Sequence, residues 1–453
     1  MKILKNITVF TMVMLLSVST VLEAREKNIS NFSSSASNLV DSTGTFDGNK
    51  IYADVANNGL FLDYHVSGDS ALEWPKGTGV HSIFQSALWM GATVNGSIRT
   101  IVGDYTQDMG PGPWGGDPLA AVHRIYKVEK SMLASPLDFA DFQEWPVEFG
   151  APWVDVDGDG VYTPLPGGTD HPEFLGDQVL WFVSNDGDPA YKLNFGTSPM
   201  NVEIQTTMFG FDRPDVFGDM VFLKQLVINK GSDDLVDTYM GLWSDPDLGY
   251  AGDDFVGCDV ALGMGYVWND GDDSQYSTLD IGTPAAGYDF FQGPMVPCED
   301  GDSEEVCPTE GAKMFGTRHP GMKNLKMSSF AFYINGDATY TDPSDETEGY
   351  FYLQGLRKDG SAYPAEIAGD LYDQRFCFYG DPNDAAGHST ANPVDGNYAA
   401  SADRRFLMSV GPFTMAAGDS QEVVFGIFHA AGGDALSSCL LYTSDAADEP
   451  LSV

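Results

Sequence analysis

The sequence predicts a mainly β protein, built as one large or two packed antiparallel β-sandwich domains with long loops. Short runs of alternating or continuous apolar residues recur along the chain, and each run is bounded by Gly, Pro, Asn or Asp, as is typical of strands. The 51 glycines and 25 prolines also favour short strands joined by turns. Because 43% of the residues are hydrophobic and 12% aromatic, the chain can bury a sizeable core.

Seven segments share this strand pattern most clearly. They are Val179–Val183, Val202–Phe209, Val221–Asn229, Thr238–Trp243, Ser329–Asn335, Arg405–Val410 and Glu422–Phe428. We expect Val221–Asn229 and Thr238–Trp243 to form an antiparallel pair, because the polar segment Lys230–Asp234 between them has the composition of a turn. Helical patterning is weak, and Leu119–Met132 is the best candidate for a helix.

The first residues have the features of an export signal. Lys2 and Lys5 precede the apolar run Ile7–Val21, which is shorter than the roughly 20 residues that a membrane-spanning helix needs. We therefore expect residues 1–24 to be a cleaved signal peptide, with no integral membrane segment after it. Residues 25–45, which are rich in Ser and Asn, are expected to be a flexible lead-in.

The remainder is expected to contain two parts and a tail. Residues 46–215 are predicted to be a β-rich part, and residues 216–438 a β-sandwich part, but a single elaborated sandwich fits the pattern equally well. When it is back-translated, Cys439–Glu449 resembles a transposase adapter used in sequencing libraries. We therefore expect residues 439–453 to be a non-native tail, so that the chain is a fragment of a longer protein.

The charge of the chain excludes two classes of partner. It carries 66 acidic residues against 23 Lys and Arg, a formal net charge of −43, so nucleic acid and anionic lipid are repelled. Solubility in a salty medium explains part of this excess, because screening removes most of the self-repulsion. The acids also gather in Gly-containing loops, and this clustering favours bound cations.

The segment Asp155–Gly160 is the strongest candidate for a metal site. Asp155, Asp157 and Asp159 alternate along it, as in a Ca²⁺ loop, and Val161 can offer its carbonyl oxygen. An EF-hand would need Glu where Pro166 stands, so this loop needs a ligand from outside. We expect it from one of three nearby acids, Asp170, Glu173 or Asp177. The alternative is a solvated acidic turn.

A second acidic cluster follows a predicted strand. Its proposed ligands are Asp245, Asp247, Asp253 and Asp254, and Asp259 lies just beyond them. So many carboxylates repel one another unless a cation or good separation relieves them. We expect a second calcium site here.

Four cysteines precede the expected tail. Cys298 and Cys307 bracket an acidic loop that a disulfide could close, as is common in exported proteins. Cys258 and Cys377 would then pair by elimination, or remain buried free thiols. Zinc is poorly supported, because the chain has no C-x-x-C pair.

Catalytic signatures are sparse. The chain has no H-E-x-x-H frame and no G-x-S-x-G elbow, and we find no phosphate-cradling Gly loop that opens a helix. A pair of acids for glycoside hydrolysis remains open, because the separation of two carboxylates cannot be read from spacing along a chain. No reaction is identified, and we expect a non-enzymatic protein.

Several strings together resemble a known group of proteins. They are Leu72–Pro75 with Ala87–Trp89, Gly150–Trp153 with the Asp loop, Leu242–Gly249, Asp253–Asp259, and Asp403–Phe406 with Gly411–Phe413. These strings resemble large, uncharacterised exported proteins of Gram-negative bacteria that use type IX secretion. In those proteins a long β-rich region precedes immunoglobulin-like modules and a C-terminal sorting domain. The resemblance implies export to the cell surface, and attaches no enzymatic role to the matching residues.

These observations predict a secreted or cell-surface protein, stabilised by calcium, with a structural or binding role. Its partners would be glycans, as for an adhesin-like or glycan-binding protein, or components of the cell envelope. The alternative is an extracellular enzyme that acts on polysaccharide, similar to a glycoside hydrolase.

Overall fold

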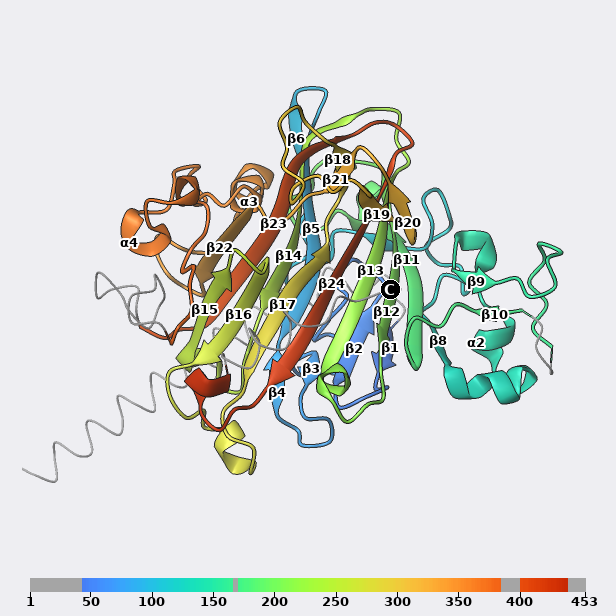
Figure 1. Cartoon of the computed structure of the whole chain (residues 1–453), viewed down its shortest axis with the longest axis horizontal. Coiled ribbons are helices and arrows are strands. Elements are labelled where there is room, and N and C mark those ends of the chain that lie inside the picture. Colours follow the sequence, from blue (N-terminus) through green and yellow to red (C-terminus); the bar gives the residue numbers. More distant parts are fainter. Residues whose placement is uncertain (1–42, 166–169, 384–399, 439–453) are drawn as a thin grey trace, which may run out of the picture. The chain divides into compact units, whose positions relative to one another are not determined.

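The computed structural model describes residues 43–165, 170–383 and 400–438, and their structure is mainly β (Figure 1). The predicted signal peptide and the predicted tail lie outside the described residues, as does the predicted lead-in except for its last three residues. Those three belong to strand β1, Thr43–Phe46. None of the helices in the described part has the length and hydropathy of a transmembrane helix.

The largest sheet has nine strands, and all of its neighbouring strands are antiparallel. In spatial order they are β15 (Asp254–Asp259), β16 (Met264–Asn269), β17 (Ala285–Gln292), β24 (Ser420–Ala430), β13 (Met220–Asn229), β12 (Val202–Gly210), β11 (Gln178–Asn185) and β7 (Gly110–Pro111), with β8 (Tyr126–Glu129) also paired to β11.

A second sheet has five strands, again antiparallel. Their order is β22 (Ser329–Ile334), β23 (Arg404–Met415), β14 (Leu235–Asp245), β5 (Gln85–Val94) and β6 (Ser97–Ile101).

The main hydrophobic core lies between these two sheets. Tyr288 of β17 packs edge-on against Phe406 of β23, with ring centroids 4.8 Å apart, and its hydroxyl lies 2.8 Å from the Ser244 hydroxyl of β14. On the other face of the five-stranded sheet, Trp89 and Trp243 stack at 5.6 Å and are fully buried. Side chains alternate between the two faces of a strand, so each sheet contributes every second residue to this layer. The result is a β-sandwich.

Smaller elements surround the sandwich. A four-stranded sheet contains β1, β2 (Tyr52–Ala56), β3 (Leu72–Glu73) and β4 (His81–Ile83). Three two-stranded ribbons pair β9 (Trp153–Val154) with β10 (His171–Pro172), β18 (Met295–Pro297) with β21 (Met322–Asn324), and β19 (Ala312–Met314) with β20 (Thr317–His319). The α-helices of the described part are α2 (Ala140–Gln143), α3 (Glu346–Leu353) and α4 (Ala365–Ala368).

Short 3₁₀ helices occupy several of the connections. They are η1 (Lys130–Ala134), η2 (Pro136–Asp138), η3 (Val147–Phe149), η4 (Pro189–Tyr191), η5 (Val216–Asp219), η6 (Ala251–Asp253), η7 (Tyr276–Thr278) and η8 (Tyr372–Gln374).

All seven predicted strands are confirmed, as β11, β12, β13, β14, β22, β23 and β24. The expected pairing of Val221–Asn229 with Thr238–Trp243 is wrong, because β13 and β14 belong to different sheets. Lys230–Asp234 therefore carries the chain from one layer of the sandwich to the other. The expected helix at Leu119–Met132 is also wrong: Tyr126–Glu129 is strand β8, where burial alternates with the period of two of a strand, and the last three residues belong to η1.

Strands from both predicted parts share the same sheets. The expected boundary between residues 215 and 216 falls between β12 and β13, which are paired neighbours, and β5 of the first part pairs with β14 of the second. Of the two expected arrangements, the described residues therefore form the single elaborated sandwich.

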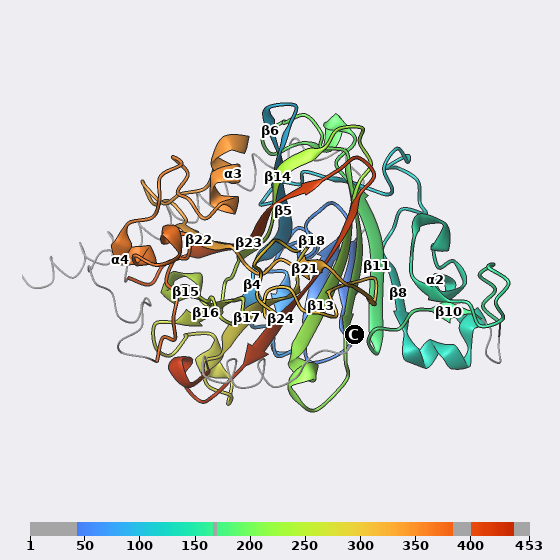
Figure 2. The same ribbon diagram turned by 45° about the horizontal axis from the view of Figure 1, so that its top comes forward.

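Two insertions flank the nine-stranded sheet. Figure 1 shows β9, β10 and α2 beyond the β8 edge, and Figure 2 shows β10 and α2 in the same place. The ribbons β18–β21 and β19–β20 lie over the end of β24, where the Met295 amide donates to the Gln421 side chain at 2.7 Å and the Phe315 amide donates to Glu422 at 3.1 Å. These two insertions carry the predicted Asp loop and the predicted disulfide loop.

Candidate metal centre

The predicted calcium loop grows out of a short two-stranded ribbon. Strand β9 ends at Val154, which is paired with His171 of β10, so Asp155 and Asp170 leave the ribbon side by side. At the base of the ribbon, the carbonyl oxygen of Pro152 accepts hydrogen bonds from the Trp145 indole and the Glu173 amide, both at 3.0 Å. The loop is therefore attached to a fixed base. Its residues 166–169 lie outside the described residues.

Four carboxylates gather at this loop. Asp155, Asp157, Asp159 and Asp170 each offer an oxygen, and these four atoms lie within 4.8 Å of one another. The first three side chains are exposed and Asp170 is buried. An oxygen-only donor set of this kind is what a hard cation such as Ca²⁺ prefers.

Backbone amides hold the three loop carboxylates in place. Asp155 accepts from the amides of Gly158 and Gly160, at 2.7 and 2.9 Å, and Asp157 and Asp159 each accept from the amide two residues further on. Both glycines have positive φ angles, 78° and 74°, which other residues rarely adopt. The glycines therefore let the chain turn tightly enough to bring the three carboxylates together.

Asp170 closes the loop from the opposite strand. One of its oxygens accepts from the Val156 amide at 2.9 Å, and the other accepts from the Thr163 amide at 2.8 Å. The buried carboxylate thus fastens both sides of the loop, and its position is set before any ion binds.

Of the three expected outside ligands, Asp170 is the one that joins the cluster. Asp177 lies elsewhere, 4.0 Å from the Lys130 ammonium, and Glu173 lies at the base of the ribbon. The Val161 carbonyl accepts from the Thr163 hydroxyl at 3.3 Å, and its part in ion binding stays a prediction.

The second expected set of ligands is divided by the structure. Asp245 and Asp247 lie together with Asp403, with one oxygen of each within 4.8 Å of the others. Arg405 already contacts two of these acids, Asp245 at 3.0 Å and Asp403 at 2.7 Å. The Arg405 guanidinium therefore offsets part of the negative charge that we expected a calcium ion to offset. A cation at this cluster stays a prediction.

Asp245 lies deep inside this cluster. Only 1% of it is exposed, and it accepts from the Tyr105 hydroxyl at 2.7 Å. Burial raises the pKa of Asp245, and the attraction of Arg405 limits the rise.

Asp253 and Asp254 are not in that group, although they were expected to be. Both accept from the side-chain amide of Asn269, at 2.9 and 3.2 Å, and Asp254 also accepts from the Leu248 amide. Burial raises the pKa of both carboxyls. The Asn269 amide thus bridges the two carboxylates, and a cation at Asp253 and Asp254 stays a prediction.

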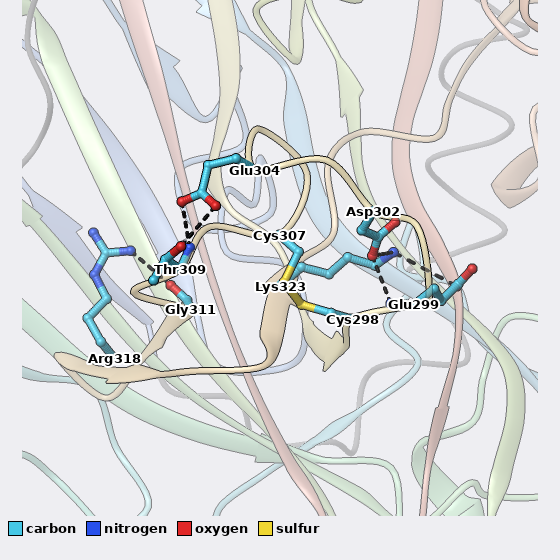
Figure 3. The surroundings of a disulfide bond; sticks show 9 residues. All are labelled: Cys298, Glu299, Asp302, Glu304, Cys307, Thr309, Gly311, Arg318 and Lys323. Carbon is cyan, nitrogen blue, oxygen red and sulfur yellow. Dashed lines mark hydrogen bonds and ion pairs between the residues drawn. A yellow bond between two sulfur atoms is a disulfide. The ribbon is translucent and has the colours of Figure 1, made fainter.

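The predicted disulfide between Cys298 and Cys307, which closes the acidic loop, is confirmed (Figure 3). Inside the loop, the Lys323 ammonium lies 2.9 Å from Asp302 and 3.8 Å from Glu299, and its hydrogen bond lowers the pKa of Asp302. The loop is therefore held by a covalent bond and by ion pairs.

Cys258 and Cys377 remain buried free thiols, which was the alternative to a second disulfide. The Cys258 thiol donates to the Cys377 carbonyl at 3.5 Å. Burial raises the pKa of both thiols well above the ordinary value, so neither has the thiolate character of a reactive cysteine.

Sequence reasoning missed two residues of these clusters. Asp403 directly precedes β23. The pairing of β23 with β14, in which Phe406 lies opposite Ser244, brings Asp403 close to Asp245. The spacing of residues along the chain does not predict that pairing. Arg405 was placed in a predicted strand and in one of the strings that carry the resemblance, with no part in a site.

A search of models of known families gave no match to this chain, and a search of curated proteins gave none either.

Proposed function

We propose that this is an exported β-sandwich protein, stabilised by calcium, with a structural or binding role at the cell surface. The observation that carries the proposal is the convergence of four carboxylates, Asp155, Asp157, Asp159 and Asp170, from two strands onto one point. Like charges held this close repel one another. A divalent cation would turn that repulsion into a cross-link between the two sides of the loop.

The donor set favours Ca²⁺ over Mg²⁺. Three of the carboxylates are exposed on a glycine-containing loop, so waters can complete the shell of six to eight oxygens that Ca²⁺ accepts. Mg²⁺ needs near-ideal octahedral geometry and gives up its waters reluctantly. A site with one buried and three exposed carboxylates fits the larger ion better.

Three features support export. The disulfide between Cys298 and Cys307 suits an oxidising compartment, the sequence begins like a secretory signal, and several strings resemble surface proteins of the type IX route. A binding role toward glycans or envelope components accords with such a location, and the net charge of −43 makes nucleic acid an unsuitable partner.

Terbium luminescence tests the ion site directly. Trp153 and Tyr162 flank the acidic loop in the sequence, and their rings pack edge to face with centroids 5.6 Å apart. We expect Tb³⁺ bound at Asp155–Asp159 to emit when these rings are excited, and Ca²⁺ to displace it at lower concentration than Mg²⁺. If Tb³⁺ gives no sensitised emission, or if Asp157→Asn leaves the emission unchanged, the assignment of the ion to this loop is wrong.

A further inference from the structure

A cavity of about 350 Å³ opens on the outer face of the nine-stranded sheet. This volume lies in the range of small-molecule sites, roughly 300–1,000 Å³. Its floor comes from the sheet, one wall from the base of the β9–β10 ribbon, and the other wall from the β19–β20 hairpin. We call it the groove.

The floor is a row of neighbours across three strands. Gln292 of β17 lies opposite Val424 of β24, which lies opposite Lys224 of β13. Phe425, the next residue of β24, is fully buried in the core between the sheets, so Val424 faces outward. At Gly426, a Cβ atom would lie 2.7 Å from the ring of Phe291, and the glycine therefore makes room for an aromatic ring beside the floor.

The first wall belongs to the candidate metal centre. Pro152 and Glu173 line the groove, and they are the residues that flank β9 and β10 directly. The Glu173 amide donates to the Pro152 carbonyl at 3.0 Å. The same ribbon that carries the four carboxylates thus forms one side of the groove.

The second wall belongs to the disulfide-clipped insertion. Lys313 lies on β19, and its amide donates to the Asn324 side chain of β21 at 2.8 Å. Next to the disulfide loop, the Arg318 guanidinium of β20 donates to the Gly311 carbonyl at 3.2 Å (Figure 3). Both walls are therefore braced by structure outside the groove.

An exposed aromatic residue stands at the lip of the groove. Phe315 and Gly316 form the two-residue turn between β19 and β20, with φ angles of 51° and 67°. This turn favours Asn-Gly, and a bulky residue with positive φ is an outlier. Phe315 is nevertheless present, and 52% of it is exposed. Neither the turn nor the core explains a phenylalanine at this position, whereas a ligand in the groove would.

The charged groups of the groove balance. Lys224 pairs with Glu422 at 3.1 Å, whereas in the described part of the chain the Lys313 ammonium and the Glu173 carboxylate have no hydrogen-bond or ion-pair partner. Two lysines against two glutamates make the groove neutral, in a chain with 66 acidic and 23 basic residues. Lys313 can donate three hydrogen bonds and Glu173 can accept several.

We infer that the groove binds a neutral saccharide, with Phe315 and Phe291 against the apolar faces of the sugar rings and with Lys313 and Glu173 bonded to hydroxyl groups. A pyranose presents an apolar C–H face and an edge of hydroxyls, and this groove offers aromatic rings together with one free donor group and one free acceptor group. This inference rests on the proposed binding role and names its ligand class.

The charge of the whole chain disfavours polyanions in the groove. A net charge of −43 opposes the approach of a uronate polymer, most strongly at low ionic strength. A neutral sugar meets no such barrier. A peptide that binds by adding a strand would require an unpaired strand edge, whereas the floor strands β17, β24 and β13 each have a neighbour on both sides.

Calorimetric titration of the calcium-saturated protein tests the inference. The probes are soluble neutral oligosaccharides of glucose, xylose, mannose and N-acetylglucosamine, with oligogalacturonate as the charged comparison. We expect at least one neutral oligosaccharide to bind, and oligogalacturonate to bind more weakly or not at all. Lys313→Met should lower the affinity by about three- to tenfold, the effect of one lost hydrogen bond.

Phe315→Asn separates a binding role from a structural one. Asn suits the turn better than Phe, so this variant should melt at the same or a higher temperature and still bind about three- to tenfold more weakly. Tyr372→Asn is the matched control: Tyr372 is another half-exposed aromatic residue with positive φ, 54°, outside the groove. It should leave the affinity unchanged.

Several results would overturn the inference: no neutral oligosaccharide binds, oligogalacturonate binds best, or Phe315→Asn binds like the wild type. None of these results bears on the terbium experiment, which reads the ion loop alone. A failed ion assignment and a failed saccharide site are thus distinguishable. Release of reducing sugar from a bound probe would keep the groove as a saccharide site and support a polysaccharide-acting enzyme.

Discussion

Replacing Asp157 by Asn should remove most of the stabilisation that calcium gives to the protein. Asp157 is exposed, and among the described residues its side chain accepts one hydrogen bond, from the Asp159 amide at 3.2 Å. The amide oxygen of the new side chain can still accept that hydrogen bond, so the substitution removes one negative charge from the cluster and little else. Asp170 would be a poorer choice, because its buried carboxylate also holds the loop together without an ion.

The size of the effect follows from mass action. Calcium sites of extracellular modules have dissociation constants of about 10⁻⁴ to 10⁻³ M, so ~10 mM Ca²⁺ stabilises the folded protein by about 1.4–2.7 kcal/mol. An unfolding entropy of about 2.1 cal/mol/K per residue over roughly 400 ordered residues turns this into a rise of about 2–3 °C in melting temperature. With a neutral amide oxygen in place of the Asp157 carboxylate, we expect less than half of that rise.

Differential scanning calorimetry of wild type and Asp157→Asn, each with excess chelator and with calcium, measures the effect. With chelator the variant should melt at the wild-type temperature or slightly above it, because one repulsive charge is gone. The matched control is Asp188→Asn, since Asp188 is also exposed and also accepts the amide two residues further on, at 2.9 Å. Equal calcium responses in all three proteins would refute the assignment of an ion to this loop.

Two further predictions concern buried charge. Burial raises the pKa of Asp289 from 3.8 to about 7, so its contribution to stability is complete below about pH 4 and is lost as the pH rises through about 7. In urea denaturation at pH 8, the free energy of unfolding of Asp289→Asn should therefore exceed that of wild type by up to about 4 kcal/mol, and it should depend less on pH. Asp300→Asn, on an exposed turn, should behave like wild type. An unchanged pH profile in Asp289→Asn would contradict this prediction. Arg405→Met should lower the free energy of unfolding by about 3–5 kcal/mol, because it leaves Asp245 buried without its cation. Adding Asp245→Leu should restore much of that stability. An equally unstable double variant would show that the ion pair is not the cause.

The strands were predictable because their signal is local. The apolar runs Val202–Phe209 and Glu422–Phe428 are visible in consecutive residues, and the structure buries most of both. Pairing is not local: β13 lies between β12 and β24, and β24 comes from the far end of the chain. A turn between two strands in sequence was read as a hairpin, and in a sandwich such a turn can equally well join the two layers.

The same distinction applies to the candidate sites. Asp155, Asp157 and Asp159 share one loop, so their spacing sufficed to predict that they converge. The fourth carboxylate required the pairing of β9 with β10 to single out Asp170 from three acids. The groove could not be predicted from the sequence, because its floor joins residues of three strands. The Phe-Gly turn at its lip becomes part of a site only when the hairpin lies over the sheet.

The strongest argument for a cation at the loop is the contrast between its carboxylates and the buried carboxylates elsewhere in the fold. Asp245 is buried against Arg405, and Asp289 is buried where its pKa rises to about 7, so both acids have a means of relief within the fold. Among the described residues, no lysine, arginine or histidine forms an ion pair with Asp155, Asp157 or Asp159. Their loop instead turns backbone amides inward to hold the carboxylates near one another, against their mutual repulsion. An arrangement that uses backbone hydrogen bonds to concentrate negative charge at one point is stable when a divalent ion supplies the missing positive charge.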